Sequence, residues 1–189
     1  MWRPPVVTSA PASPALSVAQ AKTHLRVEGS DEDTLIEDYI AAAQQMVEGM
    51  TGVRLVTQTV TIKSDDWDDL ARLPIAPVQS VSSITYVDTA GAAQTVSAND
   101  YSVRAEALEP AIQIDFGEVW PERQTDSLFT VTAVVGYTAV PPVFLSAIRL
   151  IVGDLYAMRE TAQVGASASK IPSAATVDAL LANHRIHLI

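Results

Sequence analysis

The 189-residue sequence contains no cysteine. Disulfide frameworks, thiol nucleophiles, cysteine-ligated zinc fingers and iron–sulfur clusters are therefore excluded together. Positive charge is also scarce, because 12 lysines and arginines stand against 22 aspartates and glutamates, which gives a formal net charge of −10. General nucleic-acid binding needs cations that face the phosphates, so a chain this acidic is a poor candidate for that function.

Charged residues of either sign make up only 18% of the chain, whereas hydrophobic residues make up 48%. A disordered chain has the reverse balance, so most of this one is expected to fold.

Long hydrophobic runs are missing as well. The longest uncharged stretch, residues 127–148, is interrupted by Gly136 and by Pro141 and Pro142. It therefore predicts a strand, a turn and a helix start instead of a membrane span.

The first 15 residues contain four prolines, Pro4, Pro5, Pro11 and Pro14. The apolar helix of a signal peptide cannot form in such a segment. We expect an extended N-terminal arm, either mobile or ordered on a neighbouring subunit.

Two helices are expected after the arm. Ser17 and Gln20 have the spacing of a capping box, which predicts that a short helix starts there. Ser30 is followed by three acidic residues and predicts the start of a second helix, because carboxylates stabilise a helix N-terminus. Apolar residues then recur every three or four positions up to Gly52, a typical residue after a helix end. They are Leu35, Ile36, Tyr39, Ile40, Ala43, Met46, Val47 and Met50.

The following part of the chain has the period-two alternation of β-strands. Residues 55–62 are rich in β-branched side chains and alternate at period two. Similar short runs follow, separated by turn-like clusters, at residues 81–87, 101–104, 111–116 and 128–135. This spacing predicts a small antiparallel sheet, sandwich or partial barrel.

Helical periodicity returns at Pro141 and Pro142, because proline fits the first turn of a helix. The helix that follows is apolar on several faces and is expected to be covered on more than one side. A linker rich in glycine, serine and alanine at residues 163–170 leads to a last short helix, which starts near Ser173.

These segments predict an α+β fold with a helical core built from N- and C-terminal helices and an inserted small antiparallel β domain. Neither helical pair can bury its apolar stripe alone, so the two must pack together. The expected parts are the arm at residues 1–15, the first part of the helical core at 16–52, the β insert at 53–138, the long central helix of the core at 139–163, and a linker with the C-terminal helix and tail at 164–189.

Two groups of residues could carry chemistry. Residues 65–69 hold four aspartates, which could bind a hard cation such as calcium in a metal-dependent hydrolase. Their spacing does not match an EF-hand loop, and runs of charge are usually solvated. Trp67 and Trp120 could stack on sugars in a module that binds sugar or a receptor, but core packing is the more frequent use of tryptophan. We assign no catalytic or metal-binding residue, expect no cofactor and no enzyme activity, and keep both alternatives open.

Short segments of the chain occur in a characteristic order. Residues 16–27 precede the acidic residues 30–33, an apolar helix and the Thr51-Gly52 pair. Later segments of the same order are Leu73-Pro74, residues 77–81, Ile84-Thr85-Tyr86, Gly136-Tyr137, Pro141-Pro142, Leu155-Tyr156, Arg159-Glu160, and Ala179-Leu180-Leu181 before Arg185. In this order the chain resembles head–tail connector, or adaptor, proteins of long-tailed bacteriophages and gene transfer agents. One departure is His184, which stands where family members often carry an aromatic residue.

The resemblance implies a structural virion protein. Such proteins form a ring, usually twelve-fold, beneath the portal of a DNA-filled head, where they extend the DNA channel. The implied partners are the portal protein, stopper (head-closure) or tail proteins and further copies of the chain, while DNA passes through the lumen without sequence-specific binding and no membrane takes part. The implied location is the head–tail junction of the virion, with assembly in the cytoplasm of the bacterial host.

The resemblance also implies where the portal is bound, because in similar adaptors the C-terminal helix and tail dock there. The residues that correspond in this chain are Leu180, Leu181, Arg185, Ile186, His187, Leu188 and Ile189. The first two could instead serve the core. The residues themselves fit this implication, since an apolar chain end frays alone but gains hydrophobic burial on a partner. The alternative for the tail is burial in the chain's own core.

Overall fold

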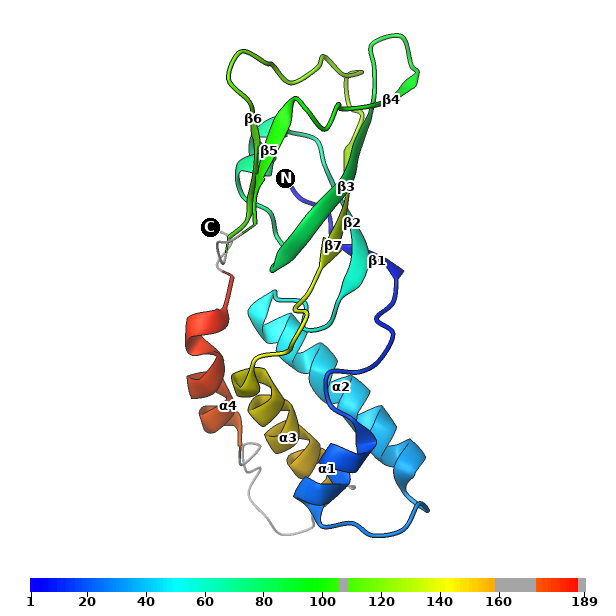
Figure 1. Ribbon diagram of the computed structural model, residues 1–189, viewed down its shortest axis with the longest axis vertical. Coiled ribbons are helices and arrows are strands. Elements are labelled where there is room, and N and C mark those ends of the chain that lie inside the picture. Colours follow the sequence, from blue (N-terminus) through cyan, green and yellow to red (C-terminus); the bar gives the residue numbers. More distant parts are fainter. Residues whose placement is uncertain (106–108, 159–172, 187–189) are drawn as a thin grey trace. The chain divides into compact units, whose positions relative to one another are not determined.

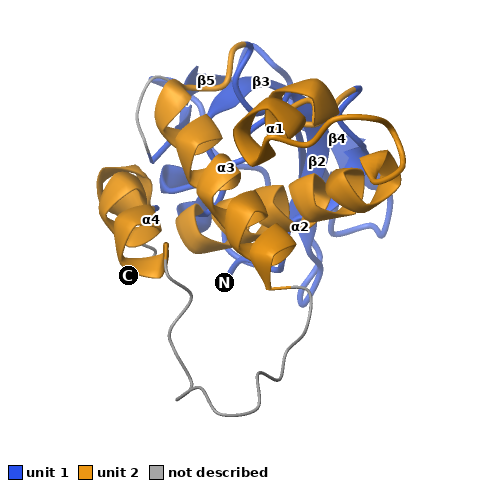
Figure 2. Ribbon diagram, turned by 90° about the horizontal axis from the view of Figure 1, so that it is seen from below, with its two compact units in different colours: residues 1–12, 52–138, 186–189 blue, residues 13–51, 139–185 orange. Residues whose placement is uncertain are grey.

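The computed structural model describes residues 1–105, 109–158 and 173–186 (Figure 1). The chain divides into two compact units (Figure 2). The helical unit consists of residues Ser13–Thr51 and Ala139–Arg185, and the β unit consists of Met1–Ala12, Gly52–Thr138 and the chain end from Ile186. The expected α+β fold, with a β insert between N- and C-terminal helices, is confirmed.

The helical unit contains α1 (Val18–Leu25), α2 (Asp33–Thr51), α3 (Pro142–Ala157) and α4 (Ala174–Leu181). Helix α3 contacts all three other helices, as expected for a helix with several apolar faces. The core of this unit consists of apolar side chains that are almost completely buried: Leu16, Ile36, Ile40, Ala43, Val47, Phe144, Ala147, Ile148, Ile151, Val152, Val177 and Leu181. None of the described helices is long and apolar enough to cross a membrane.

Local sequence signals set most of the helix ends. The capping box is present at α1, where the Ser17 hydroxyl accepts from the Gln20 N–H and the Gln20 side chain accepts from the Ser17 N–H. Gly52 ends α2 with a φ of +72°, a conformation that glycine adopts without strain. Pro142 occupies the first turn of α3.

The start of α2 differs from the expectation, because the helix begins at Asp33 and not next to Ser30. The Asp33 N–H donates to the Ser30 carbonyl in a turn, and the first α-helical bond runs from the Ile36 N–H to the Glu32 carbonyl. Two contacts from other helices hold this turn: Lys22 pairs with Asp33 at 2.6 Å, and the Tyr156 hydroxyl donates to Glu32. Long-range contacts of this kind have no signature in the local sequence.

The β unit is built on a five-stranded antiparallel sheet with the strand order β1-β2-β7-β3-β4. Its strands are β1 (Val6–Ser9), β2 (Gln58–Ser64), β3 (Val78–Val87), β4 (Ala93–Thr95) and β7 (Phe129–Val135). A separate hairpin pairs β5 (Tyr101–Arg104) with β6 (Ala111–Ile114). Side chains on β2 and β7 alternate between buried and half-exposed over most of their length, so one face of the sheet carries the core.

The N-terminal segment is not the free arm that its prolines suggested. Strand β1 pairs antiparallel with β2, and the Arg3 N–H donates to the Lys63 carbonyl at 2.8 Å. The Trp2 indole donates to the Arg72 carbonyl at 2.9 Å and packs edge-on against Phe129. A strand is possible because no proline lies within the four residues of β1, three of which are β-branched.

Candidate interaction surfaces

Three of the four aspartates in the acidic cluster at residues 65–69, Asp65, Asp66 and Asp69, interact with donors of the chain itself. Asp66 accepts the Asp68 N–H at 3.0 Å and caps a short 3₁₀ helix, Trp67–Ala71. The Met1 ammonium group lies 2.5 Å from Asp65 and 2.8 Å from Asp69, and its hydrogen bond lowers the pKa of the Asp65 carboxyl. Among the described residues, no three potential ligands converge on a metal position. The cluster therefore gives no support to a metal-dependent hydrolase.

The two tryptophans form part of an aromatic cluster. The Trp67 ring stacks on Trp120 at 5.1 Å and on Phe129 at 4.3 Å between ring centres, and its indole N–H donates to the Pro121 carbonyl. Both tryptophans pack against the core of the β unit. The Trp67 ring and its indole N–H are therefore already in contact with other residues of the chain, so the Trp67 ring is not free to stack on a sugar.

The expected docking residues have different environments. Leu181 is completely buried in the helical unit, whereas Leu180, one position earlier, is half-exposed. The Arg185 guanidinium pairs with Asp178 at 2.7 Å. Ile186 is half-buried, and a Cβ placed on Gly52 would lie 3.4 Å from the Ile186 Cβ. His187, Leu188 and Ile189 lie outside the described residues.

His184 packs beside a buried aromatic ring. Its ring lies 5.1 Å from the buried Phe144 ring, at an angle of 60°. His184 thus makes a ring-to-ring contact from the short 3₁₀ helix Ala182–His184 that follows α4.

Sequence reasoning missed an apolar groove in the helical unit. The groove has a volume of about 490 Å³ and lies between α2, α3 and α4. Met46, Met50 and Met158 are partly exposed at its rim, with 36–47% of their surface accessible. The sequence feature that could have indicated this groove is the apolar stripe of α2, because the stripe includes Met46 and Met50, which remain partly exposed.

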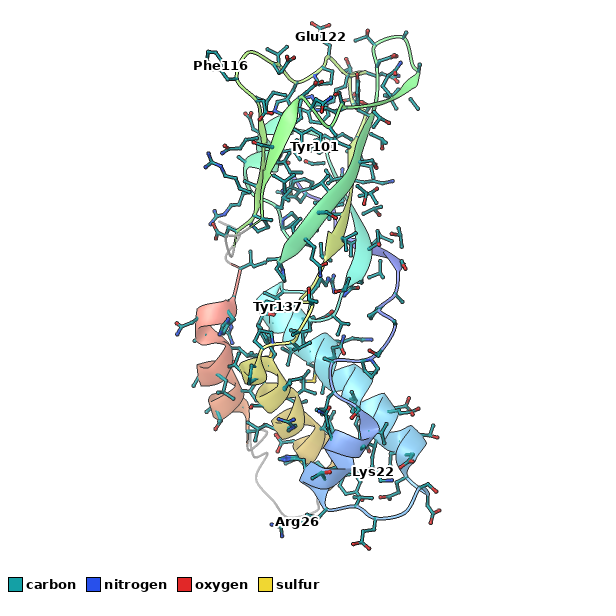
Figure 3. The ribbon with its side chains drawn as sticks, viewed as in Figure 1. Lys22, Arg26, Tyr101, Phe116, Glu122 and Tyr137 are labelled. Carbon is teal, nitrogen blue, oxygen red and sulfur yellow. The ribbon has the colours of Figure 1, made fainter. Side chains whose placement is uncertain are left out.

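Two apolar surfaces of the β unit were also not expected. Phe116 is fully exposed and Val119 is 83% exposed in the loop after β6, where Phe116 points away from the strands (Figure 3). Val6 and Val7 are 60% and 42% exposed in β1. Exposed apolar side chains that form a continuous patch often mark a surface that contacts a partner.

Comparison with known proteins assigns the family. The sequence-family model of the phage gp6-like head-tail connector proteins matches residues 16–113, which is more than half of the chain. The chain belongs to this connector family. No curated protein matches it in sequence.

Solved structures extend the likeness of this connector to nearly its whole length. A chain from the neck of an empty gene transfer agent particle, computed with C6 symmetry, is 25% identical and has a TM-score of 0.80, with 99% of this chain and 97% of that chain covered. A chain from the virion of a native gene transfer agent has the same identity and coverage and a TM-score of 0.78. A chain from the neck of the native particle, computed with C12 symmetry, is 25% identical with a TM-score of 0.73 and 97% of both chains covered. The connector is thus similar to structural components of virions.

Proposed function

We propose that this connector forms a homo-oligomeric ring at the junction between the head and the tail of a phage-like particle. One observation carries the proposal: 99% of the chain matches a chain from a particle neck computed with rotational symmetry. The family match to head–tail connectors supports the same position. The role is structural, without a catalytic step or a cofactor, and the ring is twelve-fold and assembles in the cytoplasm of the host.

The ring surrounds the path of DNA without binding its sequence. The net charge of −10 supports this part of the proposal, because an anionic wall repels phosphates and lets a duplex slide. A cationic lumen would retain DNA by the release of counterions. The ring therefore acts as a conduit between the portal protein on one side and stopper or tail proteins on the other.

The portal is bound by the C-terminal end of the chain. Leu180 and Arg185 have accessible surface at the end of the helical unit, and the apolar residues Leu188 and Ile189 follow. Burial of a large apolar side chain contributes about 1.5–3 kcal/mol, so a few of them suffice for stable docking. Ile186 and His187 complete this surface, while the complete burial of Leu181 assigns that residue to the core of the helical unit.

The test replaces the last three residues of the proposed docking segment. The variant H187S/L188S/I189S is expected to keep its melting temperature but to yield heads without tails. The control variant L188I/I189L retains the apolar surface and should join heads to tails normally. Normal joining by the serine variant would show that the tail does not dock. Particles that assemble completely without this chain would refute its role as a connector.

A further inference from the structure

The five-stranded sheet of the β unit has two open edges. Strand β1 forms one edge, and all four of its residues are exposed, with Val6 60% and Val7 42% accessible. A β-strand with two exposed valines in sequence is unusual at a free edge, because such edges readily pair with another chain. This edge has the composition of a strand that is covered by a partner.

The opposite edge is open over most of β3 (Figure 1). Strand β3 has ten residues, but only Thr85, Tyr86 and Val87 pair with β4. Within residues 79–83, Ser80, Val81 and Ser83 pair with β7, with register shifts at the two intervening positions, and the segment has no strand on its outer side among the described residues. Their outward backbone groups are available to a further strand.

Both edges lack charge in a chain that is strongly acidic. No charged side chain occurs in residues 4–21, which include β1, or in residues 73–87, which include β3. Proteins commonly protect free edges with charged side chains, and neither edge has one. Copies of a chain with a net charge of −10 repel each other, so they approach most easily through surfaces without charge.

A rotationally symmetric ring needs two different surfaces on each copy, because every copy meets one neighbour with each side. The two sheet edges are different surfaces of the same compact unit, and an edge strand can add to an exposed sheet edge through main-chain hydrogen bonds. We propose that β1 of one copy adds to the outer edge of β3, at residues 79–83, of the next copy in the ring. The inference rests on the proposed ring and specifies how its copies meet.

The absence of cysteine makes cross-linking a clean test. We would introduce V7C and S82C together, because both positions are exposed and lie on opposite edges of the sheet. Particles that contain the variant would be treated with a short bis-maleimide, and the products would be separated under denaturing conditions. The control pair V7C/T125C has an exposed second position in the loop before β7.

The double variant V7C/S82C is expected to give a ladder of dimers, trimers and larger products up to the closed ring. Each single variant and the control pair should remain monomeric. Incorporation into particles without a ladder would overturn the edge-to-edge contact but leave the ring intact. Dimers from V7C alone would also overturn it, since they indicate a two-fold contact between β1 strands. Failure of the unmodified chain to enter particles would refute the proposed function and, with it, this inference.

A charge pair gives a second test that does not use cross-linking. V7K places a cation on the β1 edge and is expected to abolish rings without lowering the melting temperature. Addition of S82E should restore them, because opposite charges on neighbouring strands attract. T125K is the matched control and should assemble normally. Rings of V7K at the normal yield, or no recovery in V7K/S82E, would contradict the inference.

Discussion

The Asp154 carboxylate in α3 accepts hydrogen bonds from both the backbone N–H and the hydroxyl of Ser173, 19 positions later in the chain. Ser173 immediately precedes α4 and is only 8% exposed. One acidic side chain therefore fixes the beginning of α4 to α3. This contact holds in place the helix that leads to the C-terminal end of the chain.

Replacement of Asp154 by alanine is expected to loosen α4. Hydrogen bonds to a charged group contribute about 1.5–3 kcal/mol, and the variant also leaves the buried Ser173 hydroxyl without this acceptor. Hydrogen exchange of the α4 amides should accelerate, whereas exchange in the β unit should not change. The control is Asp178→Ala, which removes an exposed ion pair with Arg185 and should cost about 0–1 kcal/mol. Equal effects of the two variants would contradict the assignment.

Leu180 and Leu181 are expected to separate docking from stability. Leu181→Ala creates a cavity in the core of the helical unit and should lower the free energy of unfolding by about 2–5 kcal/mol in urea titrations. Leu180→Ala removes a half-exposed side chain, so it should change stability much less while reducing the joining of heads to tails. A Leu180 variant with normal joining would remove this residue from the docking surface.

Gly136 is expected to be irreplaceable. Its φ is +101°, and an added Cβ would lie 2.2 Å from the Val56 carbonyl oxygen, which belongs to the backbone and cannot easily move. Gly136→Ala should therefore cost roughly 3 kcal/mol or more in a denaturant titration. Gly117 is the matched control, because its φ is +93° but open space surrounds it, so alanine there should cost only roughly 1–2 kcal/mol. A similar loss in the free energy of unfolding for both variants would show that the backbone shifts to relieve the clash at position 136.

The turn between β3 and β4 is expected to loosen in acid. The Gln94 side chain and the backbone N–H groups of Ala92 and Ala90 donate to the Asp88 carboxylate and hold its pKa below the ordinary value. The deprotonated group stabilises the folded turn, so its contribution is complete above the ordinary pKa and is lost as the pH falls through the lowered value. The amide signals of Ala90 and Ala92 should report this low midpoint in an NMR titration. They should not titrate in Asp88→Asn, and a midpoint at the ordinary value would contradict the network.

Features that depend on neighbouring residues could be predicted from the sequence. The capping box of Ser17 and Gln20 lies within one helical turn, and the alternation in β2 and β7 reflects which face of each strand is buried. Such signals were sufficient for the order of the main elements and for the α+β fold. They rest on periodicity and capping, which act over a few residues.

Features that depend on distant partners could not be predicted in this way. Strand β1 exists because it pairs with β2, whose register partners lie 50 to 55 positions away, and its own sequence contains no sign of that partner. The same reason applies to Leu180 and Leu181, since the helical pattern does not tell which of two neighbouring leucines is buried. The stacking of Trp67 on Trp120 and Phe129 also joins segments that are far apart in sequence.

The segment between α2 and α3 enters and leaves the β sheet through two strands that are direct neighbours, since Gln58 in β2 is the register partner of Val135 in β7. The ends of this segment therefore meet inside the β unit, but the unit is not a single insertion, because β1 from the N-terminal segment pairs with β2. Replacement of residues 58–135 by a tight turn would remove the strand with which β1 pairs, so the first residues of the chain would lose their place in the fold together with the insert.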